Sequence, residues 1–234
     1  MTRRQAATAA ILALGVPGSF YVRARLRASD PPPPQPLLII EDAKHLVTPD
    51  MAEASRGMRG RAVPPFEKPA TDGRTRRLDA LLRDGPLVLT FIKKGCPCSE
   101  AAQDFFNRLH AAYPTQTMLG VIDVGPDLAR EWADRFHAAY PLLIDVEGDL
   151  VRDLGVENSA YVVIIDPEGR VAEHWPGYSR PMLGELGALM ARATSSQEKA
   201  LDFGEAPEDL YTGCPYDLPT EAAGRSSTGT AEKP

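Results

Sequence analysis

The feature that most constrains this 234-residue chain is an alternation of two hydrophobic periods between residues 77 and 192. Short continuous apolar runs, typical of buried strands, alternate with segments whose apolar residues recur every three or four positions, as on a helix face. The expected strands are 87–92, 118–124, 142–144, 161–165 and 171–174, and the expected helices are 99–112, 127–139 and 180–192. This order predicts an α/β domain with a mixed central sheet that has helices on both faces.

Composition predicts two segments before this domain. Residues 1–29 form a basic arm in which an uncharged run, residues 6–22, lies between arginines. The run is a candidate membrane anchor or export signal, and the alternatives are an organellar transit peptide or a basic disordered arm. We therefore expect a cell-envelope location, with the cytoplasm as the alternative. Residues 30–61 form a proline-rich linker and extension with a short helix near 49–56.

The domain itself is expected at 62–192, followed by a C-terminal tail at 193–234. The tail is acidic and polar, so we expect it to be largely flexible, although residues 210–218 are apolar enough to dock. Residues 78–192 carry 10 basic and 17 acidic side chains. An acidic domain without a basic, aromatic-rich stripe does not attract a phosphate backbone, so nucleic acid is not an expected partner.

Two of the three cysteines, Cys96 and Cys98, are separated by Pro97 alone, where the first expected strand gives way to the first expected helix. A thiol at a helix N-terminus faces unpaired backbone donors and the positive end of the helix dipole, which favour the thiolate. Lys93 and Lys94 add positive charge nearby. Pro97 fits the first helical turn because its missing N–H would have no partner there. This pattern points to cysteine redox chemistry and predicts that the Cys96 sulfur is exposed to solvent.

Four blocks together resemble thioredoxin-like redoxins of the alkyl hydroperoxide reductase and thiol-specific antioxidant superfamily. The resemblance covers roughly residues 62–192, and the blocks are 65–74, 85–96, 140–145 and 164–171. It implies a thioredoxin-like fold, an oxidoreductase without a cofactor, and a disulfide, thiol or peroxide as the reaction partner. It also implies that Cys96 is the attacking cysteine, because Phe91 lies five residues before it, as in thioredoxins.

The chain departs from this family at several positions. Thioredoxins have two residues between the paired cysteines, and peroxiredoxins have Thr or Ser where Lys93 stands and Pro where Leu89 stands. Ala160 takes the position of the thioredoxin cis-proline and of the peroxiredoxin arginine. Thr90 replaces the buried acid that assists proton transfer in many thioredoxins. We expect thiol–disulfide exchange in which Cys96 attacks and Cys98 resolves the mixed disulfide, with peroxide reduction through a sulfenic acid on Cys96 as the alternative.

The third cysteine, Cys214, lies in the tail. It is a candidate resolving cysteine, a permanent disulfide partner, or an unpaired surface residue. A third interpretation of the whole chain is a non-enzymatic binding module, such as a soft-metal carrier that uses the paired cysteines and one histidine. We expect no metal, because no histidine lies within ten residues of Cys96 and Cys98 and because Asp145, Asp149 and Asp153 lack the rest of a calcium loop.

Overall fold

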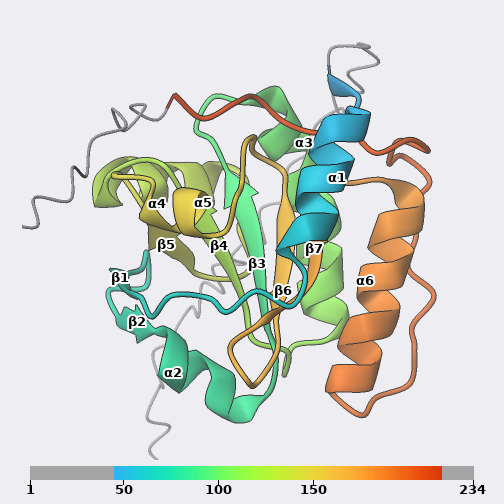
Figure 1. Ribbon diagram of the computed structural model, residues 1–234, viewed down its shortest axis with the longest axis horizontal. Coiled ribbons are helices and arrows are strands. Elements are labelled where there is room, and N and C mark those ends of the chain that lie inside the picture. The colour runs from blue at the N-terminus through green and yellow to red at the C-terminus, as the bar shows by residue number, and fades with distance from the viewer. Residues whose placement is uncertain (1–44, 218–234) are drawn as a thin grey trace, which may run out of the picture. The chain divides into compact units, whose positions relative to one another are not determined.

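The computed structural model describes residues 45–217, which contain a five-stranded sheet with the strand order β5-β4-β3-β6-β7 (Figure 1). Strand β3 is central, parallel to β4 and antiparallel to β6. The strands are β3 (Leu87–Ile92), β4 (Met118–Ile122), β5 (Leu142–Ile144), β6 (Val162–Ile165) and β7 (Val171–Trp175). The expected mixed α/β architecture is confirmed.

Six helices, one 3-10 turn and a two-stranded ribbon complete the fold of the described residues. The helices are α1 (Pro49–Met58), α2 (Leu78–Leu81), α3 (Pro97–Ala112), α4 (Pro126–Arg135), α5 (Asp149–Asp153) and α6 (Arg180–Ala193), and a 3-10 turn, η2 (Leu82–Asp84), follows α2. A separate two-stranded ribbon pairs β1 (Glu67–Pro69) with β2 (Thr75–Arg77). Periodicity predicted the long elements, whereas α2, α5 and the ribbon are too short to show a hydrophobic period.

Side chains alternate between the two faces of the sheet, as the pleat of a strand requires. In β3, Val88 and Ile92 belong to one apolar cluster with α3, α4 and α6, while Leu89 and Phe91 belong to a second cluster with α1, α2 and α5. All six β3 residues are buried, because helices cover both faces of this strand. The central strand is therefore a rigid base for the residues that follow Ile92.

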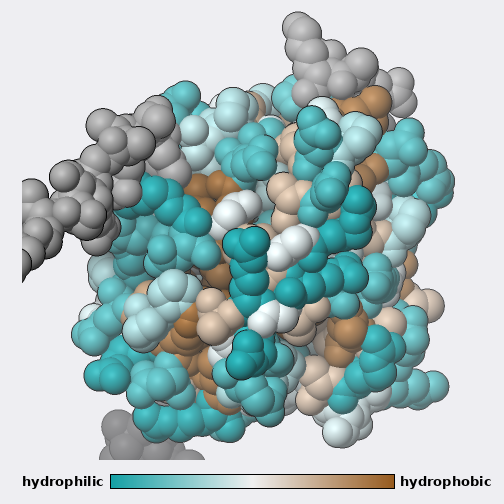
Figure 2. All heavy atoms as spheres, in the orientation of Figure 1, coloured by the Kyte–Doolittle hydropathy of each residue, from teal (hydrophilic) through white to brown (hydrophobic). Residues whose placement is uncertain are grey.

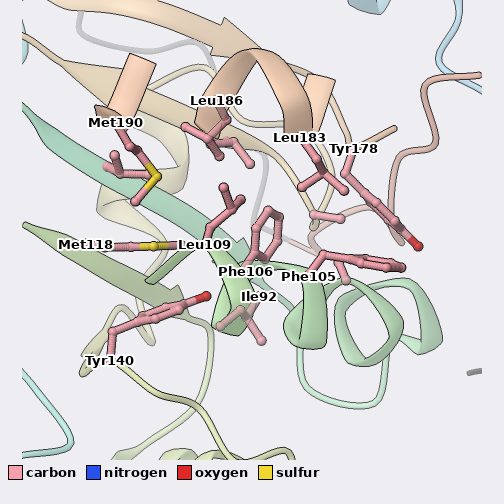
Figure 3. Close-up of a cluster of buried hydrophobic side chains, with 14 of the residues drawn as sticks. Ile92, Phe105, Phe106, Leu109, Met118, Tyr140, Tyr178, Leu183, Leu186 and Met190 are labelled. Carbon is pink, nitrogen blue, oxygen red and sulfur yellow. The ribbon is translucent and has the colours of Figure 1, made fainter. Parts of the chain in front are cut away.

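The cluster between the sheet and helices α3 and α6 is dominated by aromatic and long aliphatic side chains (Figure 3). Phe105 and Phe106 on α3 face Leu183 and Leu186 on α6, and the Phe105 ring lies 6.1 Å from the Tyr178 ring. These contacts fix α3, and the cysteines lie at its first turn.

Helix α1 lies in the extension at 30–61, for which the sequence indicated no role. Thr48 caps its N-terminus by accepting a hydrogen bond from the Met51 amide. From its buried face, the Ser55 hydroxyl contacts His174 Nδ1 and donates to the His174 carbonyl, both at 2.7 Å. The extension is thus part of the packed domain, next to the edge strand β7.

The face shown in Figure 2 is mainly hydrophilic, with small hydrophobic areas between polar side chains. The large apolar side chains that are exposed within residues 45–217 are Leu46, Leu128 and Val146. Within the same residues, no helix is both long and apolar enough to cross a bilayer. The expected anchor at 6–22 and the rest of the basic arm lie outside the described residues.

Gly120 on β4 is a position where the packing requires glycine. A Cβ atom there would lie 2.9 Å from Ile92 Cδ1 and would also overlap Leu142. We expect Gly120→Ala to lower the free energy of unfolding by about 1–3 kcal/mol, because overpacking strains a filled core.

Gly184 on α6 provides the matched control, because a Cβ added there meets no atom within 4 Å. Gly184→Ala should leave stability unchanged or raise it by up to about 1 kcal/mol, since alanine is the better helix former. Urea unfolding followed by circular dichroism measures both variants. Equal stabilities for the two would contradict the packing of β4 described above.

Candidate active site

Cys96 lies at the junction that the sequence indicated. Gly95 turns the chain with a φ of +79°, and Cys96 is then the N-cap of α3 in an extended conformation. Pro97 follows at the first helical position, and the Glu100 amide donates to the Cys96 carbonyl at 3.2 Å. The turn therefore holds both cysteine sulfurs at the positive end of a 16-residue helix.

Several donors converge on the sulfur of Cys96. The Ser159 hydroxyl lies 3.2 Å from it and the Cys214 amide nitrogen 3.1 Å from it. Hydrogen bonds from the Cys98 thiol, and then from Cys214 and Ser159, outweigh the effect of burial and lower the pKa of Cys96 to about 3. Because these donors favour the charged form, Cys96 is a thiolate at neutral pH.

The other two sulfurs hold their protons more tightly. The Cys98 pKa is raised far above its ordinary value, because its proton is bound by the Cys96 thiolate and because the site is buried. Burial, and then the same thiolate, raise the pKa of Cys214 to about 11. The site is therefore one thiolate between two neutral thiols, and all three cysteines are unpaired.

Cys96 is not solvent-exposed, which corrects our expectation from the sequence. Only 1% of the residue is exposed, and Cys98 is 3% exposed. The reason is a segment that we call the C-terminal strap, residues 210–217, which crosses the first turn of α3. We expected the tail from residue 193 to be largely flexible, whereas residues 210–217 make defined backbone hydrogen bonds with the domain.

The strap is bonded along most of its length. Tyr211 exchanges two backbone hydrogen bonds with Tyr178, at 2.8 and 2.9 Å. The Gly213 amide donates to the Ser159 carbonyl at 2.8 Å, and the Ser159 amide donates to the Cys214 carbonyl at 3.0 Å. A Cβ on Gly213 would overlap the Ser159 hydroxyl, so this position needs glycine. These bonds bring the amide of Cys214 to the sulfur of Cys96.

The two lysines lie in different environments. Lys93 Nζ donates to the Pro215 carbonyl and to the Asp217 carboxylate, both at 2.6 Å, and so fastens the end of the strap. Lys94 is exposed, and its backbone amide donates to Asp123. We predicted that both charges assist the thiolate. The structure instead gives Lys93 a role in holding the strap, and thiol, hydroxyl and amide donors surround the sulfur.

Thr90 lies on β3, and Ala160 lies in the turn before β6. Ala160 has a φ of +62°, and residues 45–217 contain no cis peptide bond. The cis-proline of thioredoxins therefore has no counterpart at this position. The Thr90 hydroxyl lies 3.2 Å from the Tyr140 hydroxyl, which donates to Gln103. Thr90 therefore belongs to a buried polar chain on one face of the sheet and has no hydrogen bond to a cysteine.

Sequence reasoning missed two residues of the site. The first is Ser159, and the signal that could have indicated it is a hydroxyl two residues before the expected strand 161–165. The second is His45, whose Nδ1 lies 3.4 Å from the Cys98 sulfur. No local pattern indicated this contact, because 53 residues separate the pair.

Comparison with known proteins identifies the domain. The family model described as AhpC/TSA matches residues 59–174. This segment is an AhpC/TSA family domain. The redoxin resemblance of the sequence is thereby confirmed, and the AhpC/TSA domain with its cysteine site is that of a thiol redox protein.

Solved structures show the same fold at low identity. Peroxidoxin BcpB from Mycobacterium tuberculosis is 24% identical, with a TM-score of 0.50. The match covers 58% of this chain and 97% of that chain. A candidate protein disulfide isomerase from Bacteroides thetaiotaomicron is 21% identical, with a TM-score of 0.53, and the match covers 59% of this chain and 91% of that chain. A candidate thiol:disulfide interchange protein DsbE from Chlorobium tepidum is 19% identical, with a TM-score of 0.52 and coverage of 58% and 97%. No curated protein sequence matches the chain.

The described residues also contain a surface pocket of about 760 Å³, lined among others by Phe66, Leu82 and Pro167 and by no cysteine. Within residues 45–217, no group of three or more His, Cys, Asp or Glu side chains is arranged to hold a metal ion.

The donors around Cys96 predict an unusual pH dependence of alkylation. With a pKa of about 3, the wild-type rate at Cys96 should stay constant as the pH falls from 8 to about 5, and should drop only near the pKa. Ser159→Ala removes one donor, so the drop should move to higher pH by about one unit. Iodoacetamide labelling with mass spectrometry measures the profile. A wild-type drop near pH 8.5, as in a free thiol, would refute the thiolate assignment.

The contact of Lys93 with the strap gives a prediction whose sign distinguishes two roles. Lys93→Met removes an ion pair and a hydrogen bond that hold the strap closed, together worth about 1 kcal/mol, so Cys96 alkylation should become about fivefold faster. Lys94→Met, the matched control, should leave the rate unchanged. Slower alkylation in Lys93→Met would show that its charge supports the thiolate and that strap closure does not limit access.

Proposed function

We propose that this chain is a thiol–disulfide oxidoreductase in which Cys96 attacks and Cys98 resolves. The observation that carries the proposal is the convergence of the Ser159 hydroxyl, the Cys214 amide and the Cys98 thiol on one sulfur. A thiolate is the nucleophile of disulfide exchange, and a second thiol two residues away can close the cycle.

The reaction proceeds in two displacements. The Cys96 thiolate attacks one sulfur of a partner disulfide, a mixed disulfide forms, and the other partner sulfur leaves as a thiolate that takes a proton. Cys98 then loses its proton and attacks the Cys96 sulfur, which releases the second partner thiolate. The second partner thiolate also takes a proton, so the partner gains two electrons and two protons, one from Cys98 and one from solvent, and the protein ends with a Cys96–Cys98 disulfide.

These two steps are reversible, and the hydrogen bonds to Cys96 favour the reverse direction, in which a partner thiolate attacks the Cys96–Cys98 disulfide. Stabilisation of the thiolate stabilises the reduced protein relative to its disulfide, so the disulfide form accepts electrons readily. The burial of Cys96 adds a condition, because a protein partner reaches the sulfur only when the strap moves. We therefore propose that the disulfide form oxidises thiols of partner proteins and that strap opening precedes the exchange.

Serine variants test the order of attack. Reduced protein is mixed with a small aliphatic disulfide, quenched with acid and weighed by mass spectrometry. Cys96→Ser should give no adduct within the time in which the wild type reacts completely. Cys98→Ser in a Cys214→Ser background should stop at a mixed disulfide, and Cys214→Ser alone should complete both steps. An adduct in Cys96→Ser would assign the attack to another cysteine.

Peroxide reduction is the second candidate, and the burial of Cys96 favours it. A sulfur that is 1% exposed is easier for a peroxide to reach than for a folded protein. The thiolate would attack the peroxide, form a sulfenic acid and release water or an alcohol, and Cys98 or Cys214 would then condense with it and release water. Stopped-flow consumption of hydrogen peroxide separates the two functions. Rapid consumption with a slow reaction toward disulfides would favour the peroxidase.

A further inference from the structure

The resolving step needs a group that accepts the proton of Cys98. In the resting site that proton is bound by the Cys96 thiolate. Once Cys96 is joined to a partner its sulfur carries no charge, so it stops being a strong acceptor. The Cys98 thiol then needs another acceptor before it can attack.

His45 is placed to be that acceptor. Its Nδ1 atom lies 3.4 Å from the Cys98 sulfur, and the residue is half-buried. The backbone around it is held by the strap: the Thr212 amide donates to the His45 carbonyl at 2.7 Å, and the Val47 amide donates to the Leu210 carbonyl at 3.0 Å. The strap that covers the cysteines therefore also positions His45.

The other titratable groups near Cys98 are less suited to take its proton at neutral pH. Tyr178 retains its own proton, because burial and the neighbouring cysteines raise its pKa. Tyr211 pairs through its backbone with Tyr178. Cys214 is a neutral thiol, and Lys93 and Asp217 pair with each other. Asp123 binds the amide of Lys94. Thr90, at the position of the buried thioredoxin acid, is engaged with Tyr140.

We propose that His45 is a catalytic base of the resolving step and takes the proton of Cys98 through Nδ1. The inference rests on the proposed disulfide exchange and assigns a role in it to a residue of the N-terminal extension. As the Cys98 proton moves to Nδ1, the Cys98 sulfur attacks Cys96, the Cys96–Cys98 bond forms and the bond between Cys96 and the partner breaks. The electron pair leaves on the partner sulfur, which takes a proton from the imidazolium or from water.

The test is His45→Asn in the full-length protein with Cys214→Ser, so that Cys98 alone can resolve. An asparagine amide occupies roughly the place of Nδ1 and keeps a hydrogen-bonding group there, but it does not bind a proton at neutral pH. Reduced protein is mixed with hydroxyethyl disulfide, and acid-quenched samples are weighed over time. The mixed disulfide should form at the wild-type rate and should resolve about 100-fold more slowly, within the usual range for a general base.

Chemical rescue shows whether the ring acts as a base or only supports the site. Added imidazole should restore part of the resolution rate of His45→Asn and should leave the rate of the parent protein unchanged, because free imidazole can take the proton of Cys98 where the side chain is missing. Slower resolution in His45→Asn without rescue would overturn the proposal, because the ring would then have only a structural role.

His137→Asn is the matched control. His137 is exposed and has a φ of +51°, a conformation that asparagine tolerates. It should resolve at the rate of the parent protein. If the parent forms no mixed disulfide, the proposed function itself fails, and this inference fails with it. If the mixed disulfide forms and resolves equally fast in His45→Asn, only the role of His45 is excluded.

Discussion

The site depends on one interaction, the hydrogen bond from the Cys214 amide to the sulfur of Cys96, 3.1 Å long. It connects the strap to the reactive atom, and it does so through the backbone, so it depends on where the strap lies more than on the side chain at position 214. A buried charge is costly unless donors replace the water that it loses. The strap and Ser159 supply such donors, so the segment that closes the site also stabilises the thiolate within it.

This arrangement couples access to reactivity. When the strap is closed, the thiolate is stabilised but shielded from large molecules. When the strap leaves, the sulfur is accessible but loses an amide donor, and its pKa should rise. Partner proteins must therefore meet Cys96 in a less stabilised state than small oxidants do, and a partner that supplies its own amide at the position of Cys214 would restore the donor.

The sequence allowed the long elements and the position of the cysteine pair to be predicted, because hydrophobic periodicity and helix-start chemistry are local signals. The covered state of Cys96 was not predictable in the same way. It follows from backbone pairing of residues 210–217 with residues near 45, 158 and 178, and such pairing leaves no local periodicity in a short segment. The tail has an acidic composition that is typical of disorder, yet Tyr211, Gly213 and Cys214 are positioned by contacts with the domain.

The pairing of Leu46 with Tyr211 connects the N-terminal extension to the strap that covers the active site. His45 and Asp217 both belong to the segments that cover the active site. Deletions that extend as far as His45 from the N-terminal side, or into residues 210–217 from the C-terminal side, would therefore disturb the catalytic centre before they disturbed the core. An assay of a domain trimmed in this way would measure an enzyme whose active site is no longer covered.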